Sequence, residues 1–202
     1  MAMSVGRVYR RIRYGKPIVV VSGLPRSGTS MAMKMLEAGG LRVVTDGLRG
    51  ADEDNPKGYY EDERVKDLHQ ATDKTWLRES RGKVIKIISF LLKSLPHDNN
   101  YKVLFMHRNL REIVASQNKM LARRGEKNDT PDDRAVALLE EQVRDARFFL
   151  RRPQFEVLEL NYRETLDSPR PLALRMAEFV GEPLDVERMT QVVDVQLYRN
   201  RA

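Results

Sequence analysis

One stretch near the start of the chain, residues 18–30, constrains the fold more than any other part of the sequence. It reads IVVVSGLPRSGTS, in which β-favouring residues run into a short segment with Gly23 at one end and Gly28 at the other. Apolar residues at helical spacing follow over residues 31–36. The pattern predicts a strand, a tight loop and a helix. Because a loop that opens a helix directs main-chain N–H groups toward one point, we expect it to hold a phosphate or sulfate group.

The loop nearly matches the nucleotide-binding pattern G-x-x-x-x-G-K-[ST], but it lacks the lysine. Thr29 stands at the lysine position, and the cation is Arg26, inside the loop. The missing amine argues against a site for ATP with magnesium. Asp46, which follows the apolar pair at residues 43–44, keeps a nucleoside triphosphatase open as an alternative, because such enzymes hold their metal with an aspartate after a strand.

Length and composition describe a single ordinary globular domain with a preference for anionic ligands. The 202 residues are 41% hydrophobic and 32% charged, and the net charge is +7. Nucleotides, nucleic acids and membrane surfaces are all compatible with this charge. The absence of cysteine excludes disulfides, a thiol nucleophile and thiolate metal ligands. No apolar signal core or membrane-spanning run is evident, so we expect a cytoplasmic protein.

Residues 1–17 form a basic segment ahead of the main domain, which we expect to span residues 18–202. Basic side chains alternate irregularly with apolar ones here, at Arg7, Val8, Tyr9, Arg10, Arg11, Ile12, Arg13, Tyr14 and Lys16. A basic arm for nucleic acid or acidic lipid is one interpretation. We favour a solvated leader or an edge strand.

Strand and helix patterns alternate along the rest of the chain. Strands are predicted at residues 18–21, 41–44, 83–88, 101–108 and 155–160, and helices at residues 31–38, 61–79, 109–122, 131–150, 161–180 and 185–193. The long polar segment at residues 45–57 is predicted to be a loop in the wall of an acceptor pocket. The alternation predicts an α/β fold, a three-layer parallel sheet with helices on both faces.

Ligands of such sheets bind at the carboxyl ends of the strands. We therefore expect the loop at residues 23–29 to share one rim with Asp46, Lys86 and Arg108. Lys86 interrupts an apolar strand, which requires either that its amine reaches solvent or that it has an anionic partner.

At this point the sequence resembles the sulfotransferases that use 3′-phosphoadenosine 5′-phosphosulfate. Residues 24–30, LPRSGTS, are similar to their 5′-phosphosulfate loop. Arg108 at the end of a strand, with Ser116 eight residues later, is similar to their 3′-phosphate motif. Weaker similarities lie at residues 55–61, NPKGYYE, and at residues 161–166, NYRETL. The resemblance extends from about residue 18 to residue 201.

The resemblance implies a phosphate-loop α/β fold and a cofactor site. The residues it assigns to the cofactor are Pro25, Arg26, Ser27, Gly28, Thr29, Ser30, Arg108, Ser116 and Arg199. The implied reaction moves a sulfonate group from 3′-phosphoadenosine 5′-phosphosulfate to a hydroxyl or amine and releases adenosine 3′,5′-bisphosphate. A small molecule, carbohydrate or lipid is the expected acceptor. Neither a metal nor a nucleic-acid partner is expected.

The catalytic residues follow the family pattern only in part. In cytosolic small-molecule members a catalytic histidine lies two residues after the strand lysine, and aligning that lysine with Lys86 places Ile88 there. Glu61 is therefore our first choice for the general base, with Asp46 second and His69 third. Arg26, Thr29 and Lys86 are expected to stabilise the charge that develops on the leaving group.

Two alternatives to a sulfotransferase remain at this stage. One is a small-molecule kinase or other nucleoside triphosphatase with a degenerate loop. The other is a non-catalytic module that binds a nucleotide or a polyanion through its basic surface.

Overall fold

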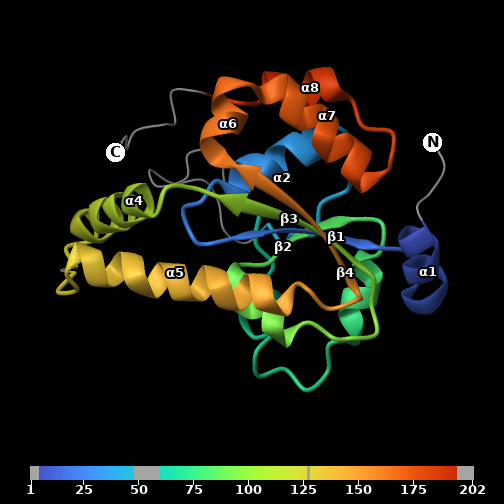
Figure 1. Ribbon diagram of the computed structural model, residues 1–202, viewed down its shortest axis with the longest axis horizontal. Coiled ribbons are helices and arrows are strands. Elements are labelled where there is room, and N and C mark those ends of the chain that lie inside the picture. Colours follow the sequence, from blue (N-terminus) through green and yellow to red (C-terminus); the bar gives the residue numbers. More distant parts are fainter. Residues whose placement is uncertain (1–4, 48–59, 127, 195–202) are drawn as a thin grey trace.

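A parallel sheet forms the centre of the molecule (Figure 1), whose computed structural model describes residues 5–47, 60–126 and 128–194. The sheet has four strands in the order β2-β1-β3-β4. Their bounds are Ile18–Gly23 for β1, Val84–Lys86 for β2, Tyr101–His107 for β3 and Phe155–Asn161 for β4. All of β1 is buried, as expected for an apolar central strand covered on both faces. The predicted α/β architecture is confirmed.

Helices cover both faces of the sheet (Figure 1). One face carries α2 (Thr29–Ala38), α6 (Tyr162–Asp167), α7 (Pro169–Val180) and α8 (Val186–Gln191). The other carries α5 (Asp132–Phe149) and two 3₁₀ helices, η1 (Thr75–Ser80) and η2 (Ser89–Ser94). Outside these layers are α1 (Val5–Tyr14), α3 (Glu63–Lys66) and α4 (Leu110–Arg123).

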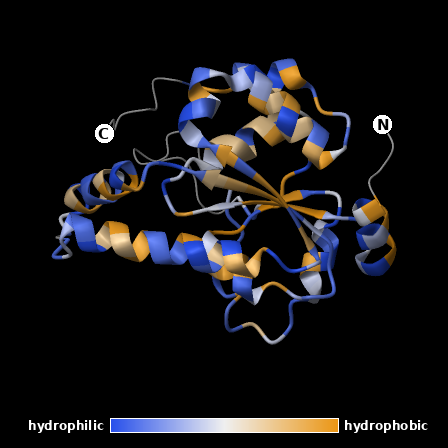
Figure 2. Cartoon of the chain, in the orientation of Figure 1, coloured by the Kyte–Doolittle hydropathy of each residue, from blue (hydrophilic) through white to orange (hydrophobic). Residues whose placement is uncertain are grey.

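Side chains of β1 alternate between two cores, because successive residues of a strand point to opposite faces. Val19 and Val21 pack in the cluster that includes α2 and α7. Ile18 and Val20 pack in the cluster that includes η2 and part of α5. Figure 2 shows the strands mainly in hydrophobic colours. Parallel pairing with β2 and β3 on its two sides sets the register of β1 and holds its carboxyl end, where the predicted anion loop begins.

Several predicted helix boundaries are confirmed by their caps. The side chain of Asn109 accepts hydrogen bonds from Arg111 N and Glu112 N and so begins α4. Pro131 immediately precedes α5. Gly181 ends α7 in the left-handed conformation, with φ of 73°. The segment at residues 161–180 is two helices rather than one, since Pro169 disfavours helical geometry at the residue before it.

Two predicted elements between β1 and β2 are wrong. Residues 41–44 do not form a strand but only a single parallel β-bridge, between Val43 and Val84. The residues that follow bond to Glu61 instead of continuing along β2. There, both the hydroxyl of Thr45 and the N–H of Asp46 donate to the carbonyl of Glu61. The helix predicted over residues 61–79 is limited to α3, followed by turns and η1. Local side-chain bonds of the polar residues, such as Asp73 accepting from the backbone N–H two residues on, compete with a continuous helix.

The basic N-terminal segment contains a helix, so the predicted edge strand is wrong, while the alternative of a solvated leader stays a prediction. Within α1, Arg7 and Arg10 are three residues apart and both donate to the carboxylate of Glu156 on β4. Only helical spacing brings residues three apart onto one side of the segment. The chain therefore forms a helix alongside the sheet edge and not another strand.

Candidate active site

The loop between β1 and α2 has the tight geometry that an anion site requires. Gly28 is the N-cap of α2, with φ of 98°, and Arg26 takes the left-handed conformation, with φ of 71°. A Cβ atom at Gly23 would lie 2.5 Å from Ser27 Oγ and 2.6 Å from the carbonyl oxygen of Met106. The loop therefore needs glycine at its start, and it carries the strain of a non-glycine residue at positive φ, which is found most often at functional sites.

The hydroxyl of Ser27 lies inside this loop and fits an anionic ligand. Ser27 is 1% exposed, and among the described residues its Oγ has no hydrogen-bond partner. Buried hydroxyls normally have a partner, so an unpaired one at the positive end of α2 is well suited to a phosphate or sulfate oxygen. Thr29 begins α2 and is buried, while Pro25 and Ser30 are half-buried beside it.

The two predicted anion motifs meet in space. Arg26 Nε donates to Ser116 Oγ on α4, 90 residues away, over 3.0 Å. Arg108, just beyond β3, donates from Nη1 to the carbonyl oxygen of Arg26 over 3.2 Å. Because β1 and β3 are parallel neighbours, their carboxyl ends place both motifs at one edge of the sheet.

Two residues that the sequence interpretation missed hold Arg108 in place. Glu112 on α4 accepts from Arg108 Nε over 2.8 Å, and each side chain is 9% exposed. The guanidinium also lies over the ring of Tyr162, 4.7 Å from its centroid, a cation–π contact. The i, i+4 spacing from Arg108 was the available signal for Glu112. Tyr162, the first residue after β4, lies in the NYRETL segment of weaker similarity, but that similarity gave it no contact with Arg108.

Tyr162 also closes the space beside Gly28, which leads to a stability prediction. A Cβ at Gly28 would clash with the Tyr162 ring, whereas Gly40, with φ of 100°, has nothing within 4 Å. Both substitutions carry the strain of positive φ, so the comparison isolates the clash with the ring. We expect the free energy of unfolding of Gly28→Ala to be lower than that of Gly40→Ala by about 1–3 kcal/mol, because only Gly28→Ala overpacks its surroundings. Thermal unfolding of both variants checks this. Equal destabilisation would show that the ring contact is relieved at no cost.

Lys86 and Glu61 form an ion pair on the same rim. Lys86 ends β2, its side chain is 9% exposed, and its Nζ lies 3.3 Å from Glu61 Oε1. Of the two alternatives expected for this strand lysine, the structure shows the anionic partner. Asp46 lies alongside, where its Oδ2 accepts from Glu63 N, within the first turn of α3, over 2.6 Å. The sheet edge thus gathers a cation and two carboxylates next to the anion loop.

The third candidate for the general base is His69. His69 is exposed in the turns after α3, with Nδ1 3.1 Å from the carbonyl oxygen of Lys66. His107 ends β3 and contacts Glu159 and Arg147, and burial lowers its pKa below the ordinary value of a histidine. Arg199 and most of the predicted acceptor loop at residues 45–57 lie outside the described residues.

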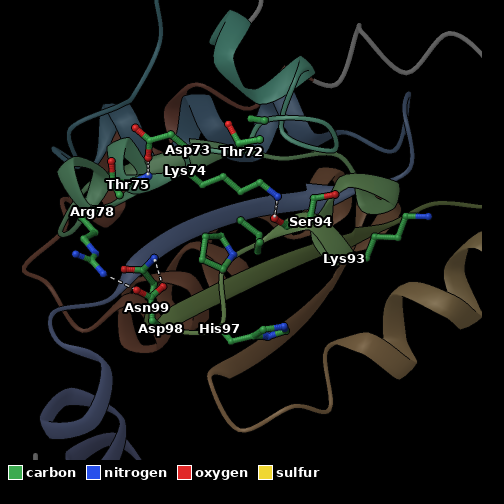
Figure 3. A pocket seen from close by; sticks show the side chains of 13 residues that line it. Thr72, Asp73, Lys74, Thr75, Arg78, Lys93, Ser94, His97, Asp98 and Asn99 are labelled. Carbon is green, nitrogen blue, oxygen red and sulfur yellow. Dashed lines mark hydrogen bonds and ion pairs between the residues drawn. The ribbon is translucent and has the colours of Figure 1, made fainter.

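A hollow of about 460 Å³ lies at the opposite end of the sheet (Figure 3). It is lined by residues 71–75, 78 and 93–99, which precede β3. Several of its charged groups bond within the wall: Lys74 Nζ donates to the carbonyl of Ser94, and Arg78 pairs with Asp98. The hollow is separate from the rim that carries the anion loop. In the described part of the chain, no cluster of three potential metal ligands occurs, and no helix is long and apolar enough to cross a membrane.

The sheet topology and the loop define an α/β protein of the phosphate-loop type, and comparison with known proteins narrows this class. The sulfotransferase domain family matches residues 16–200, so the chain belongs to the sulfotransferase family. The sulfotransferase domain from the curacin biosynthetic pathway has a similar fold, with a TM-score of 0.54 at 14% identity over 89% of this chain and 78% of that one. A sulfotransferase from Alicyclobacillus acidocaldarius gives 0.50 at 15% identity over 85% of each chain. A search of curated proteins gives no match.

Proposed function

We propose that this protein transfers a sulfonate group from 3′-phosphoadenosine 5′-phosphosulfate to a hydroxyl or amine of a small-molecule, carbohydrate or lipid acceptor. The observation that carries the proposal is the meeting of two anion motifs, through the Arg26 bond to Ser116 and the Arg108 bond to Arg26. A donor with phosphate groups at both ends of its ribose needs two such sites at close range. We further propose that residues 18–202 form the catalytic domain and residues 1–17 a leader outside it.

The residues of the loop fit the 5′ end of this donor. Main-chain N–H groups at the start of α2 and the hydroxyl of Ser27 are suitable donors to its oxygens, with Pro25, Gly28, Thr29 and Ser30 shaping the same loop. Arg26 supplies the positive charge that a lysine supplies in nucleoside triphosphatases.

The 3′-phosphate is assigned to Arg108 and Ser116, together with Arg199. The planar guanidinium of Arg108 already bonds to Glu112 and to the carbonyl of Arg26, so its orientation is set before a ligand arrives. Preorganised donors cost less ordering entropy on binding.

Lys86 and Glu61 are assigned to the chemical step. When bound, the donor supplies an activated sulfonate whose leaving group is adenosine 3′,5′-bisphosphate. Lys86, nearly buried at the end of β2, stabilises the negative charge that develops at the leaving oxygen. Glu61, 3.3 Å from that amine, accepts the proton of the acceptor hydroxyl or amine. Asp46 and His69 are the second and third candidates for this base.

Ligand-dependent thermal unfolding tests the donor assignment. We expect adenosine 3′,5′-bisphosphate at about 100 times its Kd to stabilise the protein by about 2.7 kcal/mol, and ATP with magnesium to have little effect. Ser116→Ala is expected to weaken the response to the bisphosphate and to leave the response to AMP, which lacks the 3′-phosphate, unchanged.

Two outcomes would contradict the proposed sulfonate transfer and favour another function. Stabilisation by ATP with magnesium alone would favour a kinase or other nucleoside triphosphatase and move attention to Asp46 as a metal ligand. Bisphosphate binding without transfer to any acceptor, with equal response to unrelated polyanions, would favour a non-catalytic binding module.

A further inference from the structure

The helix α1 lies at the edge of the sheet with one side fixed to it (Figure 1). Arg7 Nε and Arg10 Nη2 donate to the two carboxylate oxygens of Glu156 over 2.7 and 3.0 Å. Glu156 belongs to β4, an edge strand, and the three side chains are 18–29% exposed. Because two arginines three residues apart share one carboxylate, the rotation of α1 about its own axis is determined.

The opposite side of α1 is apolar and faces solvent. Val5, Val8, Tyr9 and Ile12 follow the i, i+3, i+4, i+7 spacing of a single helix face, and all are exposed, Val5 by 87% and Ile12 by 82%. No residue of α1 is buried. Single exposed apolar residues are common on proteins, but a contiguous stripe on a helix marks an interaction surface.

Two further arginines flank this stripe. At 100° per residue, Arg11 falls beside Val8 and Arg13 falls beside Tyr9, on opposite sides of the stripe. Both are exposed. The outward surface of α1 is thus an apolar stripe with a positive charge on each border.

We propose that α1 is an interfacial helix that binds the protein to the surface of an anionic phospholipid bilayer. Such a surface accepts an apolar helix face at the boundary of headgroups and acyl chains, and its phosphates attract the arginines that border the face. At 10 residues, α1 is far shorter than the roughly 20 residues that span a bilayer, so it lies on the surface.

Charge and placement favour this partner over two others. A nucleic acid would be contacted through arginines, yet Arg7 and Arg10 already bond to Glu156 and the centre of the outward surface is apolar. A symmetric pairing of two α1 stripes would bring Arg11 and Arg13 of both copies together, and like charges repel.

The location of α1 keeps bilayer binding separate from the proposed active site. It leads into the amino end of β1 through residues 15–17, while the Arg26 loop follows the carboxyl end of that strand. We therefore expect vesicle binding and bisphosphate binding to be independent, so failure of one leaves the other testable.

Sedimentation of the full chain with lipid vesicles tests the proposal. We expect association with phosphatidylcholine vesicles that contain phosphatidylserine and little association with phosphatidylcholine alone. Ile12→Gln removes the most central apolar side chain while keeping a good helix former, and is expected to reduce the partition coefficient at least about tenfold. The double variant Arg11→Gln/Arg13→Gln is expected to reduce it by about fivefold for each charge removed.

The matched control is Phe148→Gln, which removes a 75% exposed apolar side chain from α5. Its partition coefficient is expected to equal that of the wild type, and thermal unfolding confirms that every variant is folded. The proposal is overturned if the wild type does not associate with the anionic vesicles, or if Ile12→Gln and Phe148→Gln behave alike. Concentration-dependent dimerisation lost in Ile12→Gln would assign the stripe to a second copy, and RNA binding lost only in the arginine variant would assign it to nucleic acid.

Discussion

Glu61→Gln is expected to lower kcat by about 10²–10⁴ while the affinity for adenosine 3′,5′-bisphosphate stays the same. The amide keeps the shape of the side chain but takes up no proton from the acceptor. The carboxylate pairs with Lys86, which is assigned to the chemical step and to neither phosphate. Transfer of radiolabelled sulfonate to an acceptor identified by screening alcohols, phenols and amines measures kcat, and thermal unfolding with the bisphosphate measures binding.

Arg26→Ala is the comparison that separates the roles. It is expected to lower turnover by about 10²–10³ and also to weaken bisphosphate binding, because Arg26 belongs to the anion loop and bonds to Ser116. If Glu61→Gln abolishes bisphosphate binding while Arg26→Ala leaves it intact, the assigned roles are wrong. A large loss of turnover in Asp46→Asn or His69→Gln, with Glu61→Gln active, would identify a different base.

Arg108→Met is expected to destabilise the protein by about 3–5 kcal/mol and to abolish the response to the bisphosphate. The Arg108 and Glu112 side chains are each 9% exposed, so removing the guanidinium leaves a nearly buried carboxylate without the arginine that neutralises it. The variant also loses the contact with Tyr162 and the bond to the carbonyl of Arg26. Thermal unfolding with and without the bisphosphate measures both effects.

The double variant Arg108→Met/Glu112→Met separates stability from ligand binding. Replacing a buried ion pair by apolar residues of similar size is often close to neutral, so we expect most of the lost stability to return. The bisphosphate response is expected to remain absent, because no guanidinium is restored. Recovery of that response would mean that Arg108 only supports the fold and does not bind the 3′-phosphate.

Sequence alone determined the features that depend on neighbouring residues. The apolar run of β1, the glycines of the loop and the cap at Asn109 each act through contacts within a few positions, so their local structure could be read directly. The parallel sheet followed from the alternation of strands and helices. Because parallel strands align their carboxyl ends, the shared rim of Lys86 and Arg108 also followed.

Tertiary structure decided the features that depend on distant partners. The apolar residues of α1 follow helical spacing, but its docking through Arg7 and Arg10 onto Glu156, about 150 residues later, is revealed by no local pattern. The contact of Tyr162 with both Arg108 and Gly28 likewise joins separate segments. Side-chain pairing of this kind arises only when the sheet brings strand ends together. The sequence therefore predicted most residues of the proposed site, and the tertiary structure determined which of their side chains contact one another.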